Sequence, residues 1–184
     1  MILIGLVPLG SGMERLKSMI INHSSQVEIM RNIYNENIDS LATRPLPYRE
    51  YDEQQSWWEA NKVSLSGYLY EAIEQPGEII GFLILRDRGG FYTPTFSLSK
   101  CEWGKGYGRE IVYDYIKKAN GPLAGSQLKS NAAICYLNKQ AGWKVLATKN
   151  EGSELVELLI HPGLASGVEI DSLVYKSILG YHGI

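Results

Sequence analysis

Three glycines at alternate positions, in residues 103–109 (WGKGYGR), constrain the local backbone more than any other part of this chain. They run directly into an apolar pattern of helical spacing over residues 111–119. Because glycine has no side chain, such a loop can turn its N–H groups inward, and a helix N-terminus adds unpaired donors and partial positive charge. With Lys100, Lys105 and Arg109 nearby, the pattern predicts a cradle for a phosphate or pyrophosphate. The alternative is a glycine-rich turn before an ordinary amphipathic helix.

Two common phosphate loops are excluded by spacing. A P-loop requires G-x-x-x-x-G-K-S/T, which does not occur here. The dinucleotide fingerprint requires a glycine where Arg109 stands and an acidic residue about 20 positions later, where the nearest polar residue is Asn131. The remaining pattern, Gln or Arg followed by G-x-G-x-G/A, resembles the pyrophosphate loop of the GNAT superfamily of acyl-CoA N-acyltransferases. Trp103 departs from it in replacing Gln or Arg, which removes a side-chain contact and leaves the backbone cradle intact.

A second block, residues 131–143 (NAAICYLNKQAGW), is similar to the family's N-x-x-A/S-x-x-x-Y/H-x-K-x-G-F. Ser130 is expected to cap this short helix, and Gly142 suits the left-handed position at its end. The block follows the glycine loop in the order and spacing that the family uses. Less specific phrases at residues 33–36 and 53–58 look like phosphinothricin-type and ribosomal-protein-type acetyltransferases. The resemblance covers about residues 14–160 and implies an α/β fold: a central mixed β-sheet with helices on both faces and parted fourth and fifth strands.

Length and composition agree with a single enzyme-sized domain. The 184 residues, 45% of them hydrophobic, are enough for one domain with a substantial core. A net charge of −2 gives no overall attraction to nucleic acid or acidic membranes, and no stretch approaches the length of a membrane span. Cys101 and Cys135 are too few for a disulfide framework or a zinc site, so free thiols in a reducing, cytoplasmic compartment are expected, with no metal. Residues 1–13 are interpreted as an uncertain extension, 14–162 as the acyltransferase domain, and 163–184 as a helical extension packed on it.

The expected elements alternate strands and helices around one sheet. Residues 25–28 (SQVE) form a capping-box pattern that opens a helix with apolar positions as far as Leu41, and residues 52–55 open a second helix. Pro94 lies in the strand expected at residues 91–99; because proline cannot donate to a ladder, it predicts a bulge or a parted edge. The other strands are expected at residues 16–21, 68–74, 79–85, 123–129, 143–148 and 155–160.

The resemblance implies transfer of an acyl group, usually acetyl, from acetyl-CoA to an amine. The pyrophosphate would lie on main-chain N–H groups of the glycine loop, the pantetheine amides would pair with backbone groups near Leu98, and Asn131 would contact the cofactor arm. The residues expected to bind the cofactor are therefore Leu98, Trp103, Gly104, Lys105, Gly106, Tyr107, Gly108, Arg109 and Asn131.

The catalytic groups are less clearly marked. A base must take a proton from the attacking ammonium, and an acid should protonate the departing thiolate. Many family members carry a tyrosine where this chain has Asn138, which can hydrogen-bond a sulfur but cannot supply a proton at neutral pH. Tyr136, two helical steps away, turns by about 200° to nearly the opposite side. Glu71 is the candidate base, with Asp87, Glu102 or a water relay to a distant carboxylate as alternatives.

Three functions remain open at this stage. The leading hypothesis is an N-acyltransferase acting on an amine of a small molecule or a peptide. A CoA-binding module that has lost catalysis is a second, supported by Asn138 and by the lack of a carboxylate in the strand before the loop. The third, an acyltransferase acting on a modified nucleic-acid base, gains nothing from the acidic net charge. No motif names the acceptor or the acyl chain, and the sequence leaves open whether the chain forms a homodimer.

Overall fold

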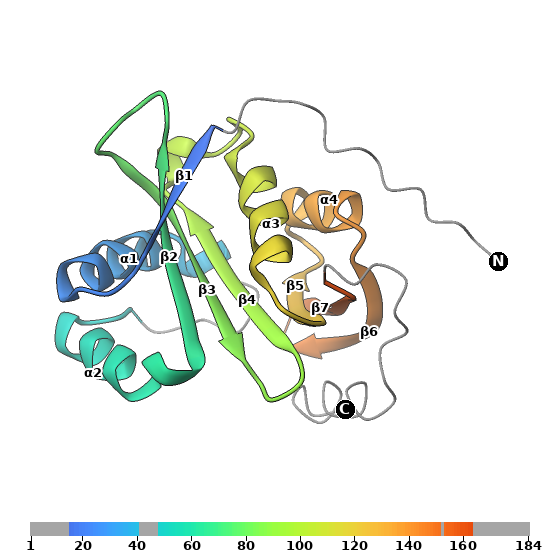
Figure 1. Ribbon diagram of the computed structural model, residues 1–184. Helices are drawn as coiled ribbons and strands as arrows, with labels where there is room; N and C mark the ends of the chain where they lie inside the picture. Colours follow the sequence, from blue (N-terminus) through green and yellow to red (C-terminus); the bar gives the residue numbers. More distant parts are fainter. Residues whose placement is uncertain (1–14, 41–47, 152, 164–184) are drawn as a thin grey trace.

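The computed structural model describes residues 15–40, 48–151 and 153–163 (Figure 1). The extension expected at residues 1–13 and the helix expected within 163–184 lie outside these residues, apart from Gly163. The elements in chain order are β1 (Leu16–Ile20), α1 (Ser24–Glu36), η1 (Ile38–Ser40), α2 (Tyr51–Asn61), η2 (Lys62–Ser64), β2 (Leu65–Ala72), β3 (Ile79–Asp87), β4 (Tyr92–Leu98), η3 (Lys100–Glu102), α3 (Tyr107–Lys118), β5 (Leu123–Leu128), α4 (Ala132–Gln140), β6 (Lys144–Glu151) and β7 (Glu154–His161).

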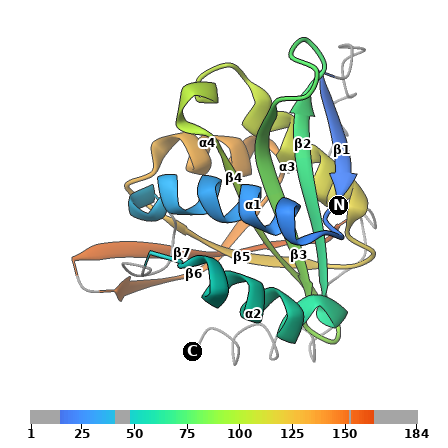
Figure 2. The same cartoon turned by 90° about the vertical axis from the view of Figure 1, so that its left-hand side faces the viewer.

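The strands form one seven-stranded sheet in the order β1-β2-β3-β4-β5-β7-β6. Neighbouring strands are antiparallel except β4 and β5, which are parallel. Helices α1 and α2 cover one face of the sheet, and α3 and α4 cover the other (Figures 1 and 2). The predicted mixed α/β sheet with helices on both faces is confirmed.

Covered faces explain why β3 is almost continuously apolar. Side chains alternate between the two faces of a strand, so Leu83 and Leu85 pack with α3 in one core while Phe82 and Ile84 pack with α1 and α2 in another. All four side chains are buried. A strand with a single covered face would alternate apolar and polar residues instead.

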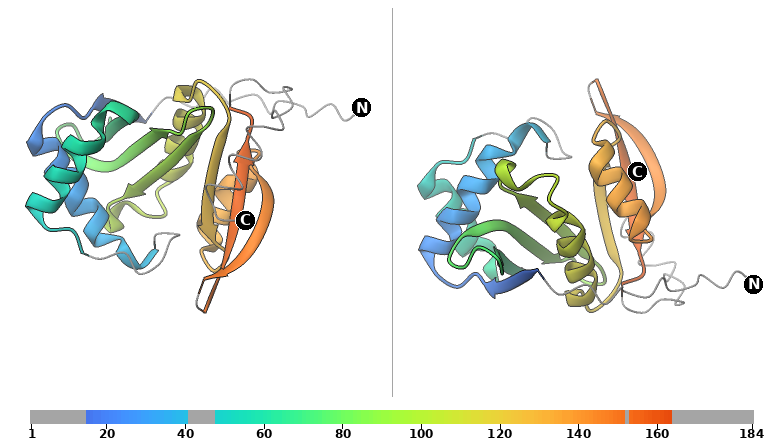
Figure 3. Two further views of the ribbon diagram at one scale, coloured as in Figure 1. Left: turned by 90° about the horizontal axis from the view of Figure 1, so that it is seen from below. Right: turned by 90° about the horizontal axis from the view of Figure 1, so that it is seen from above.

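The predicted parting of the fourth and fifth strands is present. A single residue pair joins β4 to β5, Tyr92 with Leu123, where the Tyr92 N–H donates to Pro122 O at 2.8 Å. N–H groups of alternate residues point to the same side of a strand, so the next donor toward β5 would be residue 94, a proline without an N–H. Pro94 therefore removes the second rung of the ladder, and the two parts of the sheet diverge from there (Figure 3).

Helix boundaries differ from the predictions where side chains compete for backbone groups. Helix α1 begins at Ser24, before the expected capping pattern, because Gln26 Oε1 accepts from the N–H groups of Asn22 and His23 at 2.8 and 3.1 Å. It ends at Glu36 rather than continuing to Leu41. Asn37 is the residue that follows the helix. Its buried side chain donates to the carbonyl oxygen of Ile33, in the last turn of α1, at 2.7 Å.

Candidate functional site

The glycine loop leads from the end of β4 into α3. After the short η3 turn, Gly104 and Gly106 take φ values of 79° and 92°, and Gly106 is the residue immediately before α3. Only glycine adopts this left-handed region without strain. Gly108 lies in the first turn of α3, where an added Cβ would stand 3.3 Å from Leu137 Cδ1, so it allows α3 and α4 to approach closely.

The amide donors of this loop are left open. Arg109 N–H donates to Gly106 O at 3.2 Å. Within the described part of the chain, no hydrogen bond engages the N–H groups of residues 104–108. Five consecutive unpaired donors at a helix N-terminus are the arrangement that binds an anion.

The charged side chains expected around the loop are arranged unevenly. Lys105 Nζ lies 2.8 Å from the buried carboxylate of Glu102, which raises the pKa of Lys105. The exposed Arg109 guanidinium lies 5.7 Å from the centre of the Tyr113 ring. Trp103 is half-exposed, and its indole N–H donates to Leu98 O at 3.1 Å. Arg109 thus has its charge available to a ligand, whereas the charge of Lys105 is partly neutralised.

Arg15, which no motif marked, holds the loop from behind. Its Nη1 donates to Lys105 O at 3.0 Å, its Nη2 lies 2.7 Å from Glu74 Oε1, and its guanidinium lies 4.5 Å from the centre of the Tyr107 ring. The buried Tyr107 donates its hydroxyl proton to the same carboxylate oxygen. Tyr107 can therefore serve a ligand through its main-chain N–H alone. Arg15 and Lys105 are 90 positions apart in the sequence, so only the folding of the chain brings them together.

The Leu98 carbonyl is already occupied. By strand alternation it points to the side of β4 that faces β5, and it accepts from Asn37 Nδ2 at 2.9 Å as well as from Trp103. The N–H of Leu98 points the same way, and β5 offers it no ladder partner there. A cofactor arm could therefore pair with the N–H of Leu98, but pairing with its carbonyl would have to displace one of two side chains.

Asn131 caps α4. Its Oδ1 accepts from the Ile134 N–H at 3.2 Å, so the expectation that Ser130 caps this helix is wrong; Ser130 donates instead to Glu154 Oε2 at 2.8 Å. Asn131 Nδ2 lies 3.5 Å from Ser40 O. The side chain is thus engaged at both ends, although it lies at the start of the helix that flanks the parted strands.

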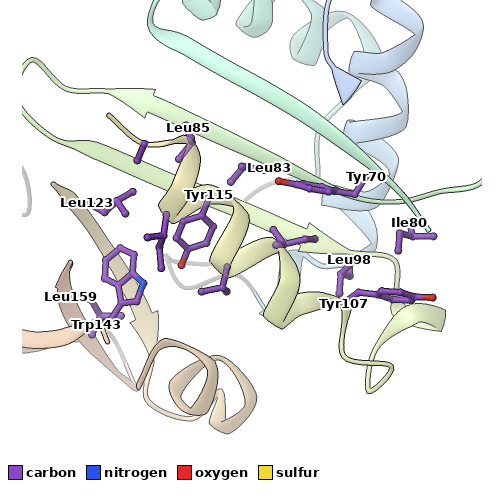
Figure 4. Packing of buried hydrophobic residues seen from close by; sticks show 14 of the residues in the cluster. Tyr70, Ile80, Leu83, Leu85, Leu98, Tyr107, Tyr115, Leu123, Trp143 and Leu159 are labelled. Carbon is purple, nitrogen blue, oxygen red and sulfur yellow. The ribbon is translucent and has the colours of Figure 1, made fainter. Parts of the chain in front are cut away.

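Asn138 is buried between α3 and β5. Its Nδ2 donates to Gln127 Oε1 at 2.8 Å, and its Oδ1 lies 3.4 Å from the hydroxyl of Tyr115 on α3. Gln127 Nε2 in turn donates to Glu157 Oε2 at 2.8 Å. Figure 4 shows Tyr115 beside Trp143, the aromatic residue that ends the second block. Tyr115 lies within the apolar pattern of residues 111–119, so no motif marked it beside Asn138.

Glu71 is not brought to this site. It lies on β2, paired with Lys17 and Ile79, and β3 separates β2 from β4. Asp87 is exposed at the opposite end of β3, next to the joined end of β4. The buried Glu102 has one oxygen on Lys105 and the other without a hydrogen-bond partner. A general base is therefore not apparent among these carboxylates.

Metal and membrane sites are not indicated by the described residues. No group of three or more His, Cys, Asp or Glu side chains in this part of the chain could hold a metal ion. None of its helices combines the length and the apolar character needed to cross a membrane. Cys101 and Cys135 are both free thiols.

Comparison of the fold with known proteins gives a consistent answer. No protein-family model and no curated protein sequence matches the chain. Among solved structures, yncA of Salmonella typhimurium, described as an acetyltransferase with its cofactor acetyl-CoA, has 16% identity and a TM-score of 0.70, covering 86% of this chain and 99% of its own. Spermidine N-acetyltransferase of Vibrio cholerae, in complex with CoA and spermine, has 13% identity and a TM-score of 0.68 over 81% and 96%. A GNAT-family acetyltransferase of Streptococcus pneumoniae has 13% identity and a TM-score of 0.64 over 80% and 98%. The chain has the GNAT fold.

Proposed function

We propose that this protein is an N-acyltransferase that moves an acetyl or other acyl group from acetyl-CoA to an amine of a small molecule or peptide. The observation that carries the proposal is the row of unpaired amides at residues 104–108, placed at the open end of the parted strands β4 and β5. An anion cradle alone would fit many phosphorylated ligands. An anion cradle at the end of two strands that have no ladder between them beyond their first pair fits a ligand with a diphosphate and a long amide-bearing arm.

The proposed cofactor contacts follow from that placement. The pyrophosphate would take the N–H groups of residues 104–108 and the charge of Arg109. The pantetheine arm would pair with the free N–H of Leu98, while the carbonyl of Leu98 remains bound to Asn37 and Trp103. Acetyl-CoA and CoA are present in two of the solved structures of this fold, which supports the same class of ligand here.

The proposed reaction needs few groups from the protein. Acetyl-CoA supplies an activated thioester, and the chain holds it so that an amine can attack its carbonyl carbon. Main-chain N–H groups would stabilise the oxyanion that forms. Asn138 would position the groups around the leaving sulfur rather than supply a proton, since an amide does not titrate near neutral pH.

Binding and turnover are tested separately. Calorimetric titration measures the affinity of the protein for CoA and acetyl-CoA. Release of free thiol with a panel of amines (a polyamine, amino acids and peptides with free N-termini) measures acyl transfer. Binding with turnover of at least one amine supports the proposal. Micromolar binding with no turnover across the panel would instead identify a CoA-binding module without catalysis, and absence of binding would contradict both.

A further inference from the structure

On the face of the sheet covered by α3 and α4, a row of polar contacts crosses the parted strands. It consists of Tyr115, Asn138, Gln127 and Glu157 and is called the polar bridge below. Tyr92 and Leu123 form the last pair between β4 and β5, so Phe96 and Gln127, each four residues further on, lie at the same height on the two diverging strands. The Tyr115 ring packs on Phe96 with 5.7 Å between ring centres, and Asn138 is hydrogen-bonded to Gln127. Tyr115 and Asn138 therefore meet beneath the region where β4 and β5 have separated.

The direction of each hydrogen bond along the polar bridge follows from the carboxylate of Glu157 at its end. An ionised carboxylate can only accept, so Gln127 must present its NH₂ group to Glu157. Gln127 then presents its oxygen to Asn138, which must answer with its own NH₂ group. Asn138 is left with its oxygen toward Tyr115, so the Tyr115 hydroxyl must be the donor. At 3.4 Å this contact is long for an O–H···O hydrogen bond, which leaves the Tyr115 proton weakly held.

A second donor beside Tyr115 has no acceptor. Trp143 Nε1 is buried without a hydrogen-bond partner, and the indole packs edge-on against the Tyr115 ring with 6.2 Å between centres. In Figure 4 the indole nitrogen and the Tyr115 hydroxyl are on the facing sides of the two rings. A buried unpaired donor is unfavourable, and it indicates a position where negative charge is stabilised when it appears.

We infer that Tyr115 donates the proton to the sulfur that leaves acetyl-CoA, with Asn138 positioning its hydroxyl and the Trp143 N–H stabilising the oxygen that remains. This inference rests on the proposed function. The amine nitrogen bonds to the carbonyl carbon, the carbon–sulfur bond breaks with its electron pair on sulfur, and the sulfur takes the Tyr115 proton. The nitrogen loses one proton as it becomes an amide, and transfer of that proton to the Tyr115 oxygen regenerates the hydroxyl.

The surroundings of Tyr115 suit a donor that stays protonated between turnovers. Burial raises the pKa of Tyr115 above its usual range, opposed in part by the nearby Trp143 side chain, so the hydroxyl keeps its proton at neutral pH. Asn138 on α4 serves to hold a tyrosine that comes from a different helix, α3.

Contact with the sulfur can be tested without knowing the amine. We would measure calorimetrically the affinity of the wild-type protein for CoA and for desulfo-CoA at about pH 9.5, above the ordinary thiol pKa of about 8.5. A hydrogen bond to a charged sulfur should make CoA bind about tenfold more tightly than desulfo-CoA. In Tyr115→Phe this ratio should fall close to one, because only the hydroxyl has been removed.

Tyr70→Phe is the matched control. Tyr70 is also buried in the same core, but its hydroxyl donates to Asp114 Oδ2 at 2.6 Å and makes no hydrogen bond with Asn138 or Gln127. Tyr70→Phe should keep the wild-type ratio of CoA affinity to desulfo-CoA affinity. With an accepted amine, Tyr115→Phe should lower kcat about a hundredfold and leave KM for acetyl-CoA within about threefold, while Tyr70→Phe changes neither.

The outcomes separate the two proposals. If wild-type protein binds CoA but Tyr115→Phe keeps both the CoA preference and the wild-type kcat, Tyr115 is not the donor and the proposed function stands. If wild-type protein binds CoA no better than desulfo-CoA, no group of the chain contacts the sulfur and the inference is wrong. If wild-type protein binds neither, the proposed function fails and the inference with it.

Discussion

The hydroxyl of Tyr115 lies 3.4 Å from the amide oxygen of Asn138, although the two residues are 23 positions apart and on different helices. Gly108, in the first turn of α3, allows this approach because Leu137 of α4 occupies the space that a side chain at position 108 would need. The glycine loop and the polar bridge are therefore coupled through the packing of one helix pair.

Replacing Asn138 with alanine should reduce turnover without abolishing it. The variant leaves the Tyr115 hydroxyl unoriented and Gln127 Oε1 unpaired, which we expect to lower kcat by about tenfold to a hundredfold and stability by about 1–3 kcal/mol. Thiol release and urea unfolding measure the two effects, with Gln140→Ala on the exposed side of α4 as control. A loss beyond about a thousandfold would exceed what one positioned donor provides and would contradict a positioning role.

Gly106→Val should abolish CoA binding because of the backbone conformation at this position. An added Cβ would meet Arg15 Nη1 at an ordinary 3.7 Å, behind the loop rather than in the cradle. The obstacle is the φ of 92°, which a β-branched residue does not tolerate. Gly106→Asn should bind CoA much better than Gly106→Val, because asparagine adopts positive φ more readily. If calorimetry shows that both variants bind CoA as tightly as the wild-type protein, the loop conformation is irrelevant to binding.

Arg15→Gln should weaken CoA binding about tenfold, equivalent to about 1.4 kcal/mol. In a trans peptide the C=O and N–H point in opposite directions, so the bond from Arg15 to Lys105 O directs the Gly106 N–H away from Arg15, toward the open side of the loop. Arg86→Gln, which alters an arginine stacked on Trp57, is the control. If Arg15 acts on the peptide, the loss should persist at high salt; a loss that salt removes would indicate a direct charge interaction with the ligand.

His161 should make the protein less stable as the pH falls. Its Nδ1 accepts from the Gly163 N–H at 2.9 Å and its Nε2 lies 3.0 Å from Ala141 O, so the neutral ring satisfies both groups. Burial lowers the pKa of His161, opposed in part by the Ala141 carbonyl. The unfolded chain therefore binds the proton more readily. The contribution to stability is complete above the ordinary histidine pKa of about 6.5 and is lost as the pH falls toward the lowered pKa of the folded state.

Urea unfolding at a series of pH values from about 7.5 to about 5 measures this slope. His161→Gln should flatten this slope, and Gln140→Ala, which changes no titrating group and lies at an exposed position, should leave it unchanged. An unchanged slope in His161→Gln would mean that other groups account for the pH dependence.

Much of the fold was predictable because it depends on local patterns. The turn between β2 and β3 has proline and glycine where a type II turn needs them, and Gly77 has a φ of 88°. Pro94 correctly indicated the parting of β4 from β5, since a missing N–H has the same consequence in any sheet. The start of α1 was misplaced because the capping pattern could be satisfied in more than one register, and Gln26 favoured the earlier one.

The chemistry around the site was less predictable because it depends on contacts between distant segments. The glycine spacing indicated an anion cradle, but Arg15 and Glu74, which hold it, come from the position just before β1 and from the turn after β2. Glu71 was a reasonable candidate base by residue type, yet the strand order places β3 between it and β4. Asn131 is predicted to contact the cofactor arm from its motif position, and only the structure shows that its side chain also caps α4.

The sequence alone determined the glycine loop, the helix it opens and the point at which two strands part, because φ preferences and missing donors act within a few residues. The folded chain decided which side chains meet in the parted region. Tyr115 and Asn138 are brought together by the packing of α3 against α4, and Gln127 and Glu157 by the pairing of β5 with β7. Such contacts depend on how whole elements pack, and no short stretch of sequence encodes them.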